Sequence, residues 1–265
     1  MKQRCFLALF LLYIPIFLYS QRVINNPLYG KKYAKTTVVS QELKGAVFYL
    51  SSGHGGPDPG AIGKSGRYSL HEDEYAYDIT LRLARTLESR GAKVYMIIQD
   101  AKDGIRDAQY LKNSKIETCM GLTIPLNQIK RLRQRSEKIN NLFHNDKSRY
   151  KRGVYVHVDS RSISKQMDVF FYHCPKSIAG QRTAQFLCNT MRDQYKEHQP
   201  TRGFGGTVSE RSLHMLTQTT PVGVFIELGN IANSADQRRL VVENNRQALA
   251  NWLADGFTKE YNTLK

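Results

Sequence analysis

The sequence predicts a single-domain α/β fold, in which a mainly parallel, twisted sheet is flanked by helices on both faces. Short apolar runs typical of buried strands recur along the chain, and longer stretches with helical spacing of apolar residues separate them. Parallel strands need long crossover connections, which helices supply. The chain has 265 residues, of which 41% are hydrophobic, so it is long enough to bury a sizeable core.

The first half of the chain shows this alternation clearly. In order, it is expected to form a strand at 46–50, a helix at 71–90, a strand at 94–98 and, at 100–124, a loop with local helix. The helix at 71–90 has apolar residues near helical spacing, and Gly91 is expected to end it. A second helix is marked by the apolar positions Leu126, Ile129, Leu132, Ile139 and Leu142.

The second half continues the pattern. It is expected to form strands at 154–158 and 169–172, a helix at 179–195, a glycine-rich loop at 203–206, a strand at 222–226 and mostly helix at 235–261. Strands that alternate with helices of this length indicate βαβ units. In such sheets, ligands bind beyond the carboxyl ends of the strands.

The N-terminus has the layout of a secretory signal peptide. Lys2 and Arg4 precede an apolar run of about 15 residues, and the chain turns polar after Ser20. This run is shorter than the roughly 20 residues of a membrane-spanning helix, although an uncleaved anchor is the alternative. We therefore expect a signal peptide at 1–20, a flexible basic arm at 21–44 and one domain at 45–265.

The charge of the chain favours an acidic partner. It has 39 Lys and Arg against 23 Asp and Glu, for a net charge of +16. An exported protein meets little nucleic acid, so an anionic polymer of the cell envelope is the expected partner and nucleic acid is not. No stable membrane insertion is expected once the signal is removed. Cys119, Cys174 and Cys188 are expected to be buried free thiols, with one disulfide as the alternative.

Polar side chains recur where the expected strands end. His54 follows the first strand, His157 lies within the third, and Glu227 directly follows the last. Since the carboxyl ends of parallel strands share one edge of a sheet, these groups are expected to gather there. Each alone has an ordinary structural explanation. A buried carboxylate such as Glu227, however, needs a cation or a hydrogen-bond partner.

A further carboxylate comes from the acidic cluster Glu72-Asp73-Glu74 at the start of the first helix. Two histidines and one carboxylate around an open position form a standard catalytic zinc set, beside which another glutamate acts as a base. Glu72 continues the core-facing stripe of the helix, whereas Glu74 lies about 200° around the axis and is the fallback. The sequence therefore predicts one Zn²⁺ ion with ligands His54, Glu72 and His157, and Glu227 beside it.

Four segments together resemble a known family. Residues 52–63, Ser-Gly-His-Gly-Gly-Pro-Asp-Pro-Gly-Ala-Ile-Gly, resemble the opening signature of the zinc-dependent N-acetylmuramoyl-L-alanine amidases, the type 3 amidase family. Residues 71–88 are similar to its acidic ligand segment, 154–160 to its strand with the second zinc histidine, and 221–233 to its segment with the catalytic glutamate. The resemblance spans about residues 46–258.

The resemblance implies zinc-dependent hydrolysis of the amide bond between N-acetylmuramic acid and L-alanine in peptidoglycan. Residues 45–265 would then be the amidase catalytic domain, with Glu227 as its catalytic base and His54, Glu72 and His157 as its zinc ligands. Peptidoglycan would be the partner, and the location would be the periplasm or cell envelope. Two alternatives remain open: a non-catalytic peptidoglycan-binding module, and a zinc peptidase that acts on wall cross-links. The sequence leaves the oligomeric state unknown.

Overall fold

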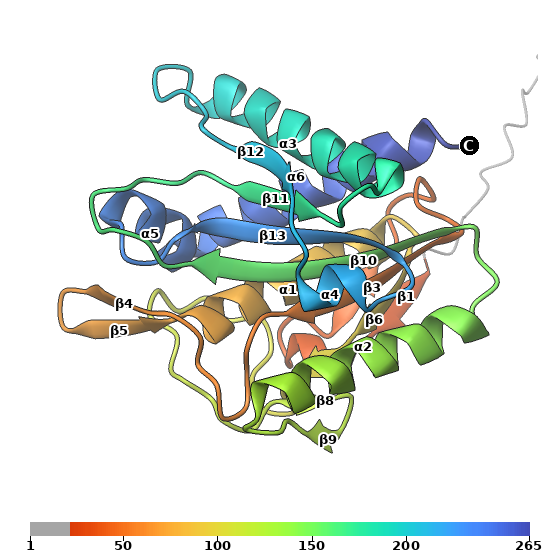
Figure 1. The fold of residues 1–265 in the computed structure, drawn as a ribbon, viewed down its shortest axis with the longest axis horizontal. Coiled ribbons are helices and arrows are strands. Elements are labelled where there is room, and N and C mark those ends of the chain that lie inside the picture. Colours follow the sequence, from red (N-terminus) through yellow and green to blue (C-terminus); the bar gives the residue numbers. More distant parts are fainter. Residues whose placement is uncertain (1–21) are drawn as a thin grey trace, which may run out of the picture.

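The computed structural model describes residues 22–265 (Figure 1). The predicted signal peptide at 1–20 lies outside the described residues. The strands are β1 (Val23–Asn25), β2 (Lys35–Thr37), β3 (Ala46–Ser52), β4 (Ile62–Ser65), β5 (Tyr68–His71), β6 (Lys93–Met96), β7 (Ile98–Gln99), β8 (Thr118–Cys119), β9 (Leu122–Thr123), β10 (Tyr150–Asp159), β11 (Phe170–His173), β12 (Thr207–Glu210) and β13 (Val222–Asn230). The helices are the 3₁₀ turn η1 (Pro27–Tyr29), α1 (Glu72–Ser89), α2 (Gln128–Asn145), α3 (Ile178–His198), α4 (His214–Thr217), α5 (Ser234–Val241) and α6 (Glu243–Asn262).

A six-stranded sheet forms the middle of the molecule, in the order β12-β11-β13-β10-β3-β6. Neighbouring strands run parallel except for β11 and β13, which are antiparallel. The expectation of a mainly parallel sheet is therefore confirmed. Because β3, β10 and β13 are adjacent and parallel, their carboxyl ends meet at one edge, where the predicted site residues were expected.

Helices cover both faces of this sheet, as β3 shows. Phe48 contacts Phe257 of α6 with 5.1 Å between ring centroids, and the next residue, Tyr49, contacts Phe143 of α2 at 6.4 Å. Successive side chains of a strand point to opposite faces, so α2 and α6 lie on opposite sides (Figure 1). Helices α1 and α3 pack against α6, and α4 packs beside α2. The predicted flanking by helices on both faces is confirmed.

Residues 22–44 differ from the expected flexible arm, because they pack against the domain. Strands β1 and β2 form an antiparallel pair, and Tyr29 and Leu43 are fully buried. The Tyr29 hydroxyl donates to Glu88 of α1 at 2.7 Å. The polar and basic composition of this stretch predicted a flexible arm, although a few apolar side chains pack it against the domain.

Two other expectations are corrected. Residues 100–124 contain no helix; β8 and β9 lie there instead and form a small antiparallel sheet with β7, which precedes this stretch. Leu126 and Ile129 were expected on the core face of a helix, yet they are 76% and 73% exposed. Helix α2 begins only at Gln128, after the cap residue Asn127. Of its later apolar positions, Ile139 is fully buried, whereas Leu132 and Leu142 are partly buried. Strand β12 and helix α4 were not predicted, since both are short.

Cys119 and Cys188 are buried free thiols, as expected, whereas the free thiol of Cys174 is only partly buried. Within residues 22–265, every helix is too short or too polar to cross a lipid bilayer.

Candidate metal centre

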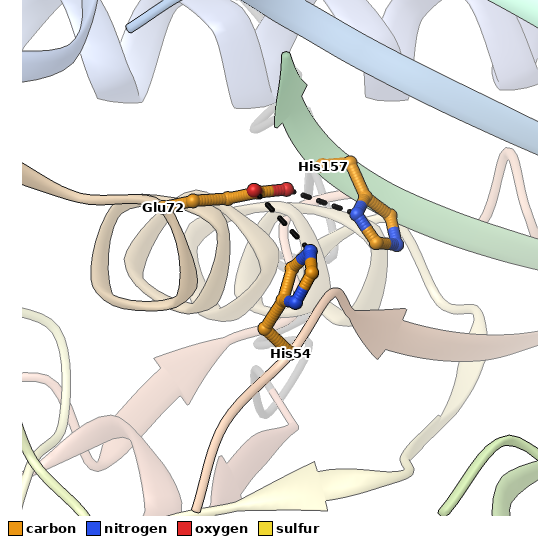
Figure 2. A group of neighbouring side chains, drawn as sticks. All are labelled: His54, Glu72 and His157. Atoms are coloured by element: carbon orange, nitrogen blue, oxygen red, sulfur yellow. Dashed lines mark hydrogen bonds and ion pairs between the residues drawn. The ribbon is translucent and has the colours of Figure 1, made fainter. Parts of the chain in front are cut away.

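Three side chains from separate parts of the chain meet at the carboxyl edge of the sheet (Figure 2). His54 lies in the loop after β3, Glu72 is the first residue of α1, and His157 lies near the end of β10. One ligand atom from each lies within 4.8 Å of the others. The structure therefore brings together the three residues that the sequence predicts as metal ligands.

The Glu72 carboxylate lies between the two imidazole rings. Its Oε1 atom is 2.9 Å from His157 Nδ1, and its Oε2 atom is 3.2 Å from His54 Nε2. Backbone N–H groups of Ala61 and Val158 donate to the same two oxygens, at 2.9 and 3.1 Å. Burial would raise the pKa of Glu72, but the hydrogen bonds from the histidines outweigh burial and hold it below its usual range. Glu72 is thus a fixed carboxylate anion.

His54 is held by its own loop. It has a φ of +56°, a left-handed conformation that few non-glycine residues adopt, and its Nδ1 atom lies 2.7 Å from Asp58 Oδ2. Burial lowers the pKa of His54, but contacts with the Asp58 and Glu72 carboxylates outweigh burial and raise it to about 9. The Asp58 contact leaves Nε2 turned toward Glu72.

Two glycines make room for these rings. A Cβ atom on Gly53 would approach the His157 ring closer than 3.0 Å, and one on Gly60 would lie 2.6 Å from Glu72 Oε2. No real Cβ atom packs so closely. These glycines of the first signature therefore have a steric role that ordinary turn formation does not explain.

Glu227 lies on β13 in register with His157 on β10, so the two side chains lie on the same face of the sheet. The Phe225 ring, two residues earlier, stacks on the His157 ring with 4.3 Å between centroids. The Oε2 atom of Glu227 is buried, and no described residue offers it a hydrogen bond. Burial, with the nearby carboxylates of Glu72 and Asp159, raises the pKa of Glu227 well above its usual range.

This donor set fits a catalytic zinc ion. Zinc takes imidazole nitrogens and carboxylate oxygens, and catalytic sites use three protein ligands with one position left open. The two histidines and Glu72 supply such a set, and the unpartnered Glu227 oxygen lies on the neighbouring strand. The fallback residue Glu74 lies elsewhere: its carboxylate contacts Arg106 at 2.6 Å and belongs to a second acidic group with Asp73 and Glu117.

The sequence reasoning missed three residues around His54. Asp58 contacts the His54 ring, Arg131 of α2 contacts the Asp58 carboxylate, and Arg135 of α2 donates to the His54 carbonyl. The spacing of Arg131 and Arg135, four residues apart, indicated that they share one face of a helix. Nothing in the sequence indicated that this face would meet the loop.

Comparison with known proteins agrees with this geometry. The sequence model of the N-acetylmuramoyl-L-alanine amidases matches residues 49–259. The chain belongs to this amidase family. It is thus an N-acetylmuramoyl-L-alanine amidase, a hydrolase of peptidoglycan breakdown. Members of the family depend on zinc, which agrees with the donor set of His54, Glu72 and His157.

Individual amidases are similar over most of this chain. The germination-specific N-acetylmuramoyl-L-alanine amidase of Bacillus subtilis is 22% identical, over 84% of this chain and 82% of that protein. The probable cell wall amidase LytH of Staphylococcus aureus is 26% identical over 84% of this chain, but this covers only 61% of that protein.

Solved structures share the fold. The amidase AmiC2 of Nostoc punctiforme has a TM-score of 0.58 at 18% identity, covering 83% of this chain and 99% of that chain. The CwlD amidase of Clostridioides difficile, solved in complex with the GerS lipoprotein, has a TM-score of 0.60 at 17% identity, covering 83% and 100%. At these identities, the likeness supports the α/β architecture.

Proposed function

We propose that this amidase cleaves the bond between N-acetylmuramic acid and L-alanine at a zinc ion held by His54, Glu72 and His157, with Glu227 as the general base. The convergence of three ligand atoms within 4.8 Å, from three separate segments, carries this proposal. A carboxylate and two imidazoles are costly to bury together unless a cation or hydrogen bonds compensate them. A bound zinc ion would also compensate the unpartnered Glu227 oxygen nearby.

In this reaction, the proposed zinc ligands hold the metal and Glu227 transfers the proton. When bound, zinc supplies Lewis acidity, which lowers the pKa of water and polarises a carbonyl group. Glu227 takes a proton from the attacking water and passes it to the amide nitrogen as the C–N bond breaks. The products are the lactyl carboxylate of the sugar and the free amino group of L-alanine. The raised pKa of Glu227 suits a group that must both accept and release this proton.

The charge and the N-terminus support an extracytoplasmic role. Peptidoglycan carries carboxylates on its peptides, and a chain of net charge +16 attracts such a polymer over a long range. Peptidoglycan lies outside the cytoplasm, so the enzyme must be exported to reach it. The predicted signal peptide at 1–20 would supply that export, to the periplasm or cell envelope.

Digestion of purified peptidoglycan tests this function. The protein is expected to release free L-alanine amino termini, to lose this activity in EDTA and to regain it with Zn²⁺. Mass spectrometry of the products identifies the bond. New amino termini on other residues only would identify a peptidase instead, and binding to peptidoglycan without any product would identify a binding module.

A further inference from the structure

A cavity of about 180 Å³ adjoins the candidate metal centre, on the face of the sheet that α2 and α4 cover. His54 and His157 form part of its wall, and Arg131 and Arg135 of α2 form another part. A group that enters this cavity therefore lies beside the proposed place of amide cleavage. The reaction proposed above uses only the two histidines of this wall and assigns no role to the arginines.

Arg135 is the unusual member of this wall, because it is buried and the part of the chain that the structure describes gives it no counter-ion. The residue is only 3% exposed. Its guanidinium donates to the backbone carbonyls of His54 and, at 3.4 Å, Ser52, while its Nε has no partner. Within residues 22–265, no carboxylate lies within 4.0 Å of it. An arginine has five N–H donors, so several of them remain available.

A buried cation without an anion is costly, and proteins rarely keep one without a use for it. Burial lowers the pKa of Arg135 to about 10, so it is still charged at neutral pH. Arg131, one helical turn earlier, is different: it pairs with the Asp58 carboxylate. Arg135 is therefore a cation of this cavity that no carboxylate of residues 22–265 neutralises by direct contact.

We propose that this cavity binds a carboxylate of the substrate's peptide, with Arg135 as the cation that recognises it. The planar guanidinium matches a carboxylate, and a charge-assisted hydrogen bond in a buried site is strong. Apolar side chains, among them Leu132 and Phe225, also line the cavity and keep the charge poorly solvated. The proposal rests on the proposed function and adds a specificity-determining residue to it.

The position of the cavity indicates which part of the substrate enters. The scissile amide joins the sugar's lactyl group to a peptide, and that peptide carries the substrate's carboxylates. With the carbonyl at the metal centre, a short peptide segment reaches from the amide nitrogen into a neighbouring cavity. The site would thus select anionic stem peptides over those whose carboxylates are amidated.

A purely structural role for Arg135 makes a different prediction. Through its bond to the His54 carbonyl, Arg135 supports the loop of a zinc ligand. If this support were its whole purpose, its loss would weaken zinc binding and impair anionic and neutral substrates equally. The charge preference of the enzyme is therefore the readout that separates the two roles.

The test uses two muramoyl peptides, one with free carboxylates and one in which these are carboxamides. Calorimetry measures their binding to the intact protein, and kcat/KM is measured for each. The wild type is expected to favour the free carboxylates by about tenfold or more. Arg135→Gln is expected to lose most of this preference, while Arg133→Gln, an exposed arginine of the same helix, keeps it.

Each other outcome is decisive. Equal binding of the two peptides by the wild type would overturn the proposal without any variant, even if Arg135→Gln does not fold. An Arg135→Gln protein that keeps the full preference, or that loses zinc and impairs both peptides alike, would also overturn it. If neither peptide is cleaved, the proposed function fails, and the binding preference still decides whether the cavity takes a carboxylate.

Discussion

Asp58 and His54 face each other across one turn of the same loop, with 2.7 Å between Asp58 Oδ2 and His54 Nδ1. This contact occupies one ring nitrogen and leaves Nε2 beside Glu72, 3.2 Å from its carboxylate. Arg131 contacts the same Asp58 carboxylate from α2. A carboxylate behind a histidine ligand fixes the tautomer and orientation of the ring, so Asp58 would prepare His54 for the proposed zinc ion.

Replacing Asp58 by Asn should therefore weaken zinc binding. The His54 ring would lose its anionic partner, and partners of this kind are typically worth about 10- to 100-fold in metal affinity. Competition with a chromogenic chelator measures the effect. Asp193→Asn, at an exposed position of α3, is the matched control and should bind zinc as the wild type does. Equal affinities for Asp58→Asn and the control would show that Asp58 does not orient the ligand.

Zinc binding should also depend on pH over an unusual range. In the metal-free protein, the Asp58 and Glu72 carboxylates outweigh burial and raise the pKa of His54 to about 9. A metal binds only the neutral ring, so binding must displace this proton. The apparent affinity should keep rising up to about pH 9, whereas an ordinary histidine would let it level off near pH 7. Calorimetry in buffers of different ionisation enthalpy counts the released proton; no proton release at pH 8 would contradict the pKa shift.

The sequence predicted the architecture because the main strands and helices have strong local patterns. The apolar run before Ser51 identifies a strand, and the apolar face of α1 identifies a helix. Because the connections between such elements are short, few arrangements of the strands and helices are possible. The phase of α1 alone favoured Glu72 over Glu74 as the ligand. The structure places these two carboxylates in different surroundings, beside the histidines and beside Arg106.

What the sequence could not predict are contacts between segments far apart in the chain. Helical spacing places Arg135, unlike the exposed Arg133, on the face of Ile139, but nothing local indicates that this face meets the His54 loop. The packing of Tyr29 on Glu88 was hidden for the same reason, because a lone aromatic in a polar stretch has no periodicity. Tertiary packing decided these positions, and local sequence carries little information about it.

Glu227→Gln should separate zinc binding from catalysis. Glutamine keeps nearly the same volume but cannot accept the proton of water, and general-base catalysis typically contributes about 10²- to 10⁴-fold. We expect kcat to fall by that amount while zinc content, measured by atomic emission, stays at that of the wild type. Normal turnover by the variant would remove Glu227 from the mechanism. Loss of zinc as well would mean that Glu227 supports the metal site instead.

Gly53→Ala should disable the candidate metal centre by steric hindrance alone. Gly53 donates its N–H to Val156 on the neighbouring strand at 2.7 Å, and the substitution keeps this bond. The added Cβ would nevertheless press against the His157 ring, closer than 3.0 Å to several of its atoms. Since the ring also stacks on Phe225, it has little room to retreat, and we expect zinc affinity and activity to fall together. Gly205→Ala is the control, because its Cβ would meet nothing closer than 3.4 Å. Normal zinc binding by Gly53→Ala would show that His157 is free to move and that the ligand geometry is less tightly fixed than the packing indicates.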